Sequence, residues 1–366
     1  MSSTDLPVGD ITLFDCVTQA AEQLTEAGVA FGHGTTNAFD EAAWLVLWQL
    51  GLPLDTPLAP AAAPAAAEQH AGSSRATADA LPDAGELAEL MTSVDAAASI
   101  EPVDSTVASA SGDAIESPEK YIINHPVALA EQAQIAILLK ARIDTRKPAA
   151  YLTHEAWLQG VAFYVDERAI VPRSLIAEVL VEGSLDYWLG ENTHRVLDLC
   201  TGNGSLAVIA AMVYPDVIVQ ASDISAEALE VARINVDRHG FHDRIILRQG
   251  DGLPKSGTHY DLILCNPPYV NAKSMATLPP EFQAEPAIAL DGNTQGGSDG
   301  MDFVRHLLAD APACMTEQAI LVLEIGHERA HFEAAFPTLD VMWLATSAGE
   351  DQVLLVTREA LSTMAP

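Results

Sequence analysis

The sequence predicts an α/β fold with a parallel sheet, preceded by a small helical domain and ending in a β-hairpin. From residue 194 onward, short apolar runs alternate with stretches of helical periodicity, which is the pattern of βαβ units. Before that point, apolar residues recur with the spacing of amphipathic helices. Near the C-terminus, two strand-like runs at 341–346 and 352–358 flank the segment SAGED and predict the hairpin.

Composition and charge narrow the class of protein. The 366 residues include 18 Lys and Arg against 51 Asp and Glu, which gives a formal net charge of −33. A negative field of this strength repels phosphate backbones and argues against direct nucleic-acid binding. The four cysteines form no C-x-x-C pair, so neither a zinc knuckle nor a disulfide framework is indicated. No apolar run reaches the roughly 18 residues of a membrane span, and the acidic N-terminus is unlike a signal peptide, so we expect a soluble cytoplasmic protein without a membrane partner.

Residues 1–52 and 119–147 are predicted to form one small helical domain. ITLFDCVTQAAEQLTEAGV and NAFDEAAWLVLWQLG each carry a helical stripe of apolar residues, and a glycine ends each helix. Asn37 is the expected cap of the second helix. In the third helical region, Pro126 either breaks the helix or starts its main part. We assign 1–147 as a whole to this N-terminal domain and expect it to recognise the substrate.

An Ala/Pro-rich segment at about 53–118 interrupts the helical domain. It contains no Phe, Tyr or Trp, and its one basic residue is Arg75. Because such a segment has little apolar bulk to offset the entropy of ordering it, we expect it to be mostly disordered, with a transient helix at 83–91. It is either a spacer or a tethered docking segment.

The first motif with chemical content runs from Asp198 through a glycine-rich turn into a helix that begins near Ser205. Glycines let the backbone approach a ligand closely, and ligands of α/β proteins bind at the carboxyl ends of such strands. The motif is not the dinucleotide fingerprint, because Ala207 replaces its third glycine, and no lysine follows to make a P-loop. A tight turn without a ligand is the alternative. The residues of this motif that we expect to bind a cofactor are Asp198, Thr201, Gly202 and Gly204.

Two acidic residues end the next two predicted strands. Asp223 lies 19 residues after Gly204, where a carboxylate can accept hydrogen bonds from both hydroxyls of a ribose, unless it belongs to the cap of the next helix. We expect Ile224 to contact the same cofactor and Ser225 to be the N-cap. Asp251 closes the third strand, where it either accepts a hydrogen bond from an adenine amino group or serves the Gly-Asp-Gly turn.

The most informative motif is Asn266-Pro267-Pro268-Tyr269, directly after the predicted strand 260–265. The prolines end the strand and fix a rigid loop. The side-chain carbonyl of Asn266 and the backbone carbonyl of Pro267 are two convergent acceptors, which suit a planar NH2 group. Tyr269 can stack against that plane. We expect Asn266, Pro267 and Tyr269 to be catalytic, Asn266 also to contact the cofactor, and all four residues to bind the substrate.

Together, the glycine loop, Asp223 and NPPY resemble the class I S-adenosylmethionine-dependent methyltransferases that act on a planar amino or amide nitrogen. Adenine methyltransferases of DNA and protein glutamine methyltransferases share this set of motifs. The resemblance implies a Rossmann-like seven-stranded sheet whose last strand is antiparallel, and a catalytic domain at 181–366. It also implies S-adenosyl-L-methionine as the cofactor, S-adenosyl-L-homocysteine as its product, and no metal.

The segment 148–180 resembles the protein glutamine methyltransferases more narrowly, since in that family a strand hairpin and a V-P-R segment connect the helical and catalytic domains. AYLT-x-EAW, FYVDER and VPRS, together with 32–42 and 278–300, resemble the branch that modifies protein three of the large ribosomal subunit. The release-factor branch would more often carry I-P-R-P, whereas Ser174 follows Arg173 here.

This resemblance covers about 1–52 and 119–366. It implies methylation of a glutamine side chain, giving N(5)-methylglutamine, in that ribosomal protein, either free or in an assembly intermediate. The release-factor branch is the alternative. An adenine-specific nucleic-acid methyltransferase is a weaker one, because the negative charge opposes phosphate binding.

Several other residues keep two interpretations. Arg168 and Arg173 either orient the cofactor carboxylate or the substrate, or pair locally with Asp166 and Glu167; we expect Arg173 to bind substrate. Glu285 either helps to close the site or lies in a surface loop. The glycines expected to give a mobile lid are Gly296, Gly297 and Gly300. The histidines expected to be structural are His33 and His154.

Overall fold

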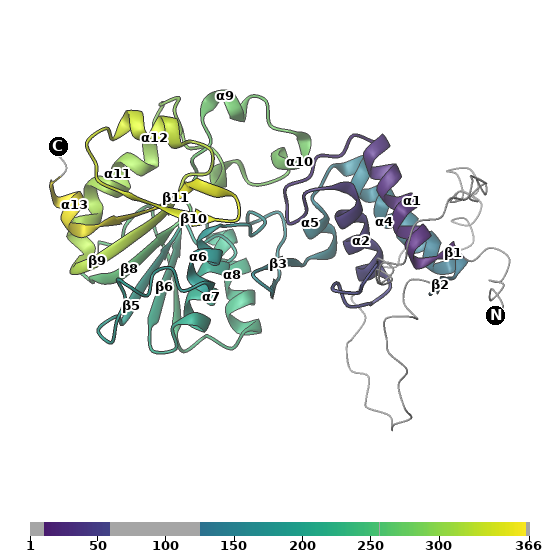
Figure 1. The fold of residues 1–366 in the computed structure, drawn as a ribbon, viewed down its shortest axis with the longest axis horizontal. Helices are drawn as coiled ribbons and strands as arrows, with labels where there is room; N and C mark the ends of the chain where they lie inside the picture. The colour runs from purple at the N-terminus through teal and green to yellow at the C-terminus, as the bar shows by residue number, and fades with distance from the viewer. Residues whose placement is uncertain (1–10, 59–124, 256, 364–366) are drawn as a thin grey trace, which may run out of the picture. The chain divides into compact units, whose positions relative to one another are not determined.

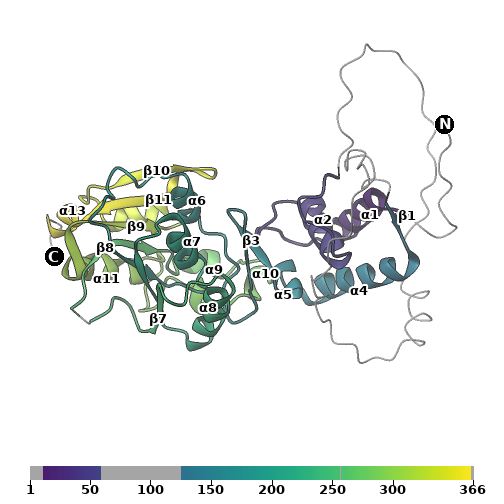
Figure 2. The same cartoon turned by 90° about the horizontal axis from the view of Figure 1, so that it is seen from below.

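The structure is a computed structural model in which three stretches of the chain are described, residues 11–58, 125–255 and 257–363 (Figures 1 and 2). Nearly all of the segment at 53–118, predicted to be a disordered linker, lies outside the described residues, and so does the predicted transient helix at 83–91. Across the described stretches, no helix is both long and apolar enough to cross a membrane.

The chain divides into two compact units. The first, here called the helical unit, comprises Met1–Phe31 and Thr35–Ala149, and the second, the sheet unit, comprises Gly32–Gly34 and Ala150–Pro366. The three residues Gly32–Gly34 therefore belong with the sheet, although the chain on both sides of them belongs to the helical unit.

The helical unit packs three helices together: α1 (Leu13–Glu26), α2 (Ala38–Gln49) and α4 (Leu129–Thr145). Asn37 caps α2 as predicted, since its side chain accepts a hydrogen bond from the Asp40 N–H at 3.0 Å. Pro126 lies in a short strand, β2 (Pro126–Val127), which pairs with β1 (Ile11–Thr12). It therefore precedes α4 rather than breaking it. A buried ion pair joins α2 to α4, with Arg142 Nε 2.8 Å from Glu41 Oε1.

The sheet unit contains a seven-stranded sheet in the order β10-β11-β9-β8-β5-β6-β7. β11 is antiparallel to both of its neighbours, and β5 to β9 run parallel to one another. The predicted Rossmann-like sheet with an antiparallel last strand and a closing hairpin is confirmed. The strands are β5 (Arg195–Leu199), β6 (Ile218–Asp223), β7 (Ile245–Gln249), β8 (Tyr260–Cys265), β9 (Met315–Glu324), β10 (Met342–Thr346) and β11 (Gly349–Thr357).

Alternate strand residues face two helical layers, because successive side chains of a strand point to opposite faces of the sheet (Figure 1). Val196 and Leu262 pack on the face covered by α6 (Ile176–Val181) and α7 (Ser205–Val213). Leu197 and Ile263 pack on the opposite face. The helices whose apolar residues cover that second face are α11 (Asp302–Asp310), α12 (Arg329–Ala335) and α13 (Arg358–Thr363).

The remaining elements lie outside the seven-stranded sheet. β3 and β4 form a two-stranded antiparallel hairpin that precedes the sheet in the chain, and short helical turns follow β8. These elements are α5 (Ala149–Thr153), β3 (Ala156–Leu158), β4 (Val161–Phe163), α8 (Ala226–Arg238), α9 (Ala272–Met275), α10 (Pro280–Gln283), η2 (Ala287–Ala289) and η3 (Ala311–Cys314).

Candidate active site

The strand order brings the predicted motifs to one place. β5 and β8 are parallel neighbours, with Leu199 opposite Cys265, and β6 lies on the other side of β5. The direction in which the chain adds strands reverses between β5 and β8, and ligands of open α/β sheets bind at such a reversal, beyond the carboxyl ends of the strands. The glycine loop follows β5, Asp223 ends β6, and Asn266 follows β8. The structure therefore collects all three at this edge.

The glycine loop has a conformation that needs its glycines. Gly202 and Gly204 have φ angles of 56° and 81°, in the left-handed region that other residues rarely adopt. At Gly204, a Cβ atom would also lie 3.1 Å from the Cβ of Ala232 in α8. α7 begins at Ser205, as predicted. The loop therefore turns tightly between β5 and α7, and its backbone can closely approach a ligand at the carboxyl end of β5.

Asp198 organises this loop from beneath. It is fully buried, and its Oδ2 accepts hydrogen bonds from the Thr201 hydroxyl and from the Ala207 N–H, the latter at 3.0 Å. Burial raises the pKa of Asp198 to about 7. Its other oxygen, Oδ1, is buried without a hydrogen-bond partner among the described residues. The structure thus gives Asp198 and Thr201 a part in shaping the loop, and direct contact with a cofactor stays a prediction.

Asp223 links two loops. Its Oδ2 accepts a hydrogen bond from the Gly202 N–H and its Oδ1 one from the Ser225 N–H, both at 2.9 Å. Ser225 is the N-cap of α8, as predicted, accepting from the Ala228 N–H. A carboxylate offers about four acceptor positions, so Asp223 keeps acceptor capacity for ribose hydroxyls beside its backbone donors. Ile224, next in the chain, is 47% exposed at the same edge.

Asp251 is exposed at the rim of a hollow of about 280 Å³ that Ser222 and Gln249 also line. Ser222 Oγ is buried there and has no hydrogen-bond partner in the described part of the chain. The position is compatible with either expected role of Asp251.

The NPPY loop presents two unused acceptors. Within the described residues, neither the side-chain amide of Asn266 nor the carbonyl of Pro267 has a hydrogen-bond partner. Pro267 is buried, whereas Asn266 and Tyr269 are half-buried. Burial raises the pKa of Tyr269, so its hydroxyl stays protonated. The motif therefore offers two free carbonyl oxygens beside a neutral aromatic ring.

Sequence reasoning missed the glycine that makes room for this ring. Gly326 follows β9 with a φ of 52°, and a Cβ there would lie 2.7 Å from Cε2 and 2.9 Å from the hydroxyl oxygen of Tyr269. The signal available in the sequence was a glycine just after a predicted strand, which by itself indicates only close approach of backbone.

Two of the three glycines of the predicted lid, Gly297 and Gly300, are closely packed. A Cβ at Gly297 would lie 2.2 Å from Asp302 Oδ1, and one at Gly300 would lie 2.0 Å from the carbonyl oxygen of Tyr269. Asp302 Oδ2 accepts hydrogen bonds from the Gln295 and Gly297 N–H groups at 2.8 and 2.9 Å. This loop therefore packs directly behind the NPPY loop, and whether it moves stays a prediction.

The two arginines of VDERAIVPRS have different partners. Arg168 pairs locally, as one interpretation held, with Asp166 at 2.6 Å, and also with Glu230 of α8 at 3.0 Å. Arg173 instead forms two 2.7 Å hydrogen bonds to the two oxygens of Glu285. Glu285 is buried, so it does not lie in an open surface loop.

Ser174 follows Arg173 at the position where the I-P-R-P motif of the release-factor branch has its second proline. Its hydrogen-bond partner is Glu324, at the end of β9. Its hydroxyl donates to Glu324 Oε2 at 2.5 Å, and the Leu175 N–H donates to the same oxygen at 2.9 Å. Burial raises the pKa of Glu324 to about 7. A proline at 174 could not make this bond.

The Glu324 carboxyl predicts a specific pH dependence of stability. It titrates near 4.5 when unfolded and near 7 when folded, so in between the folded state binds more protons and its stability falls as the pH rises. Glu324→Gln removes this dependence. From about pH 5.5 to about pH 8, we expect wild type to lose about 2 kcal/mol of unfolding free energy relative to the variant. Urea unfolding at the two pH values measures it, and a difference independent of pH would contradict the prediction.

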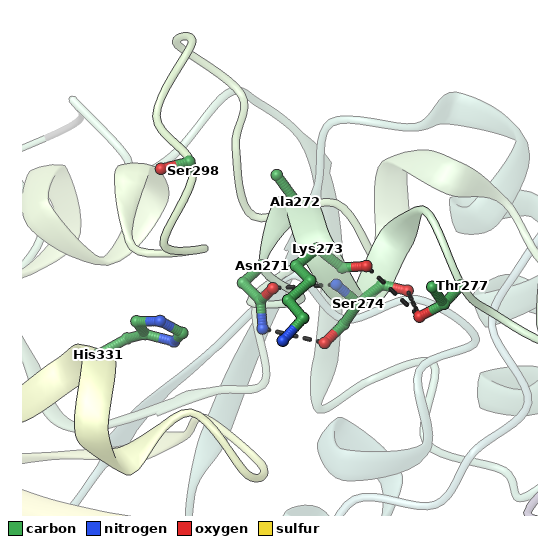
Figure 3. Close-up of a pocket in the computed structure, with 7 residues that line it drawn as sticks. All are labelled: Asn271, Ala272, Lys273, Ser274, Thr277, Ser298 and His331. Atoms are coloured by element: carbon green, nitrogen blue, oxygen red, sulfur yellow. Dashed lines mark hydrogen bonds between the residues drawn. The ribbon is translucent and has the colours of Figure 1, made fainter.

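A polar hollow lies beside the NPPY loop (Figure 3). It has a volume of about 710 Å³, and Lys273, Ser274 and His331 are among the residues that line it. Glu328 contacts two of the residues that line the hollow. It accepts a hydrogen bond from Asn271 Nδ2 at 2.6 Å and pairs with His331 Nδ1 at 2.5 Å. The first residue of the chain that lines the hollow is Asn271, two positions after Tyr269 of the NPPY motif.

Comparison with known proteins adds to this geometry. The family model for the methyltransferase small domain matches residues 178–291. The ribosomal protein uL3 glutamine methyltransferase of Bordetella pertussis is 43% identical over 96% of this chain and 97% of its own. The chain belongs to the ribosomal protein uL3 glutamine methyltransferase family. The Burkholderia pseudomallei member is 39% identical over 99% of both chains. Among solved structures, ribosomal protein L11 methylase from Lactobacillus delbrueckii subsp. bulgaricus is 19% identical, with a TM-score of 0.34, over 50% of this chain and 75% of that one.

The protein is therefore an enzyme, a methyltransferase with the class I fold. Its cofactor is S-adenosyl-L-methionine, as predicted. The residues present fit that cofactor. The loop at Gly202 and Gly204 leaves backbone exposed for close approach, and Asp223 has acceptor capacity at the position where a ribose would lie. The described part of the chain has no group of three or more His, Cys, Asp or Glu side chains placed to hold a metal ion.

Proposed function

We propose that this enzyme methylates the side-chain amide nitrogen of a glutamine in ribosomal protein uL3, giving N(5)-methylglutamine. The observation that carries the chemistry is the pair of unpartnered acceptors at Asn266 and Pro267 beside the Tyr269 ring. The relatives named for uL3 glutamine methylation, similar over nearly the whole chain, support the choice of acceptor protein.

The acceptor pair addresses the main difficulty of the reaction. An amide nitrogen is a poor nucleophile, because its lone pair is delocalised into the carbonyl. The Asn266 side-chain oxygen and the Pro267 carbonyl would accept both N–H bonds, which orients the nitrogen and increases its electron density. Tyr269 would stack on the amide plane, and Pro268 would keep the loop rigid. Orientation of this type can contribute roughly 7–11 kcal/mol in intramolecular analogues.

The other proposed roles follow the positions of the residues. Gly202 and Gly204 would approach the cofactor with their backbone, while Asp198 and Thr201 maintain the loop. Asp223 would accept the ribose hydroxyls, and the cofactor residues further along the edge would be Ile224, Asp251 and Asn266. S-adenosyl-L-methionine, when bound, supplies an electrophilic methyl group. No strong base is required, because an amide methylated on nitrogen loses its extra proton readily.

The proposed partner is uL3, either free or in an assembly intermediate, with Arg173 among the residues that contact it. The hollow beside the NPPY loop has room for polypeptide flanking the glutamine, and its Lys273, Ser274 and His331 are polar groups suited to backbone carbonyls. The net charge of −33 supports a protein rather than a nucleic acid as the direct contact. A substrate of this kind places the reaction in the cytoplasm.

Transfer of labelled methyl from S-adenosylmethionine tests the proposal. The two acceptors are unmethylated uL3 and an unmethylated class-1 release factor, each paired with a variant in which the target glutamine is replaced by glutamate. We expect label on uL3 alone, lost in its Gln→Glu variant. Label on the release factor alone would assign the enzyme to the other branch. Label retained by the Gln→Glu variant would exclude amide chemistry at that residue.

A further inference from the structure

Three side chains, His33, Arg173 and Phe282, and the backbone N–H of Val171 gather around the buried carboxylate of Glu285 in the sheet unit. Glu285 Oε1 accepts from the Val171 N–H at 3.0 Å and from Arg173 Nη1 at 2.7 Å. Its Oε2 accepts from Arg173 Nη2 at 2.7 Å and lies 3.4 Å from His33 Nε2. Burial alone would raise the pKa of Glu285, but the Arg173 guanidinium and His33 hold it at about 2. The group is therefore an anion throughout the working range of the enzyme.

His33 reaches this cluster from the three-residue segment that belongs to the sheet unit. Its side chain is 1% exposed, and its ring centroid lies 4.2 Å from that of Phe282. Gly32 has a φ of 126°, and a Cβ there would lie 3.1 Å from Phe282 Cζ. Gly32 thus gives the chain the backbone conformation and the close approach to Phe282 that accompany the position of the His33 imidazole.

Phe282 also contacts the arginine. The guanidinium carbon of Arg173 lies 5.6 Å from the Phe282 ring centroid, so the Phe282 ring packs against both side chains that approach the Glu285 carboxylate, Arg173 and His33. Arg173 is consequently held by a two-point ion pair, by a bond from Nη1 to the Val171 carbonyl at 3.1 Å, and by this ring. These contacts fix the position and the orientation of the Arg173 guanidinium.

Arg173 still has donors to offer. A guanidinium carries five N–H bonds, and within the described residues the contacts of Arg173 use only Nη1 and Nη2, which leaves Nε–H and one Nη2–H. Its side chain is 26% exposed, and its charge acts on the nearby Tyr269 hydroxyl. A fixed, partly exposed cation near the NPPY tyrosine is suited to a carbonyl oxygen of the substrate.

We propose that Glu285, supported by His33, is a positioning residue that fixes Arg173 so that the free N–H groups of Arg173 bind a carbonyl oxygen of the substrate polypeptide. The inference rests on the proposed function, because the substrate it names is the glutamine-bearing protein. This inference also gives a role to the GHG segment, Gly32–Gly34, which belongs neither to the cofactor motifs nor to the NPPY motif.

A mutant cycle with uL3 as acceptor tests the proposal. Arg173→Ala should raise KM for uL3 about 10-fold or more, and Glu285→Gln should raise it by a smaller factor in the same direction. If Glu285 acts through Arg173, the double variant is no worse than Arg173→Ala alone. Calorimetric affinity for S-adenosylmethionine should stay within about twofold of wild type in all three. Arg168→Ala is the matched control, since this arginine of the same segment pairs with Asp166 and Glu230, and its KM should not change.

His33 provides a second pair of variants. His33→Gln keeps a donor near the Nε2 position, whereas His33→Phe keeps the ring against Phe282 and removes the donor. We expect His33→Phe to raise KM for uL3 in the same direction as Glu285→Gln, and His33→Gln to restore most of that loss. Thermal unfolding of each variant shows whether it is folded.

Three outcomes would overturn the inference. Losses that multiply in the double variant would mean that Glu285 acts independently of Arg173. A fall in cofactor affinity at unchanged KM for uL3 would place Arg173 on the cofactor. Wild-type enzyme that binds S-adenosylmethionine but does not label uL3 would refute the proposed function itself, whereas normal labelling with multiplying losses would refute only the positioning role.

Discussion

Asn266→Ala should lower kcat for methyl transfer by about 10²- to 10³-fold while the protein remains folded. Removing one preorganised hydrogen-bond partner of a reacting group costs rate on this scale. The Asn266 side chain has no hydrogen-bond partner among the described residues, so its loss breaks no contact that supports the fold. Single-turnover methyl transfer to uL3, measured beside thermal unfolding, gives the two quantities needed.

Asn266→Asp separates the acceptor role from the others. The aspartate keeps an oxygen at the position of the amide carbonyl, so it should retain more activity than alanine if accepting an N–H bond is what matters. If aspartate is as inactive as alanine, the NH2 group of Asn266 carries the role instead. Alanine activity within about threefold of wild type would rule out the two-acceptor arrangement altogether.

The sequence predicted those parts of the site that depend on short stretches of chain. The glycine loop, Asp223 and NPPY each follow a strand directly, and the carboxyl ends of parallel strands meet at one edge of a sheet whatever the rest of the chain does. Periodicity did not give the strand order: the seven-stranded sheet with an antiparallel last strand came from the family resemblance, and the reversal between β5 and β8 came from the structure.

The contacts that support these motifs could not be predicted in this way, because their partners are far apart in the chain. Glu285 and Arg173 are separated by 112 positions, and Ser174 and Glu324 by 150. No periodicity or motif in a single sequence pairs such residues; the packed sheet decides which carboxylate faces which donor. The sequence offered Asp166 and Glu167 as partners of Arg173 because they are close in the chain. In the structure the partner of Arg173 is the distant, buried Glu285.

The glycines near 300 illustrate the same limit. Their spacing predicted flexibility, because a glycine in a loop indicates conformational freedom and says nothing about what passes close to it. In the structure, Gly300 has a φ of 79° and lies against the backbone of the NPPY loop, whereas Gly296 has a φ of 89° and open space around it. Two glycines that look equivalent in sequence therefore have different consequences when substituted.

Gly300→Ala is expected to reduce kcat/KM for uL3 by about 100-fold. Its Cβ would lie 2.0 Å from the Tyr269 carbonyl oxygen and 3.1 Å from the Asn271 nitrogen. Both neighbours are backbone, so no side chain can rotate away, and the NPPY loop would have to shift by about 1 Å to reach an ordinary contact. A misplacement of this size at a reacting centre can cost about 10²-fold in rate.

Gly296→Ala is the control that makes this loss interpretable. Both variants place a Cβ on a left-handed backbone, which costs each about 1–2 kcal/mol of stability, but only Gly300→Ala adds the collision with Tyr269. We therefore expect Gly300→Ala to lose about 1–3 kcal/mol more stability than Gly296→Ala, to remain folded at the assay temperature, and to lose far more activity. Equal activity losses would mean that backbone strain or loop motion, rather than the position of the NPPY loop, limits the reaction. Near-normal activity in Gly300→Ala would mean that the site tolerates a displaced Tyr269, which contradicts the stacking role proposed for it.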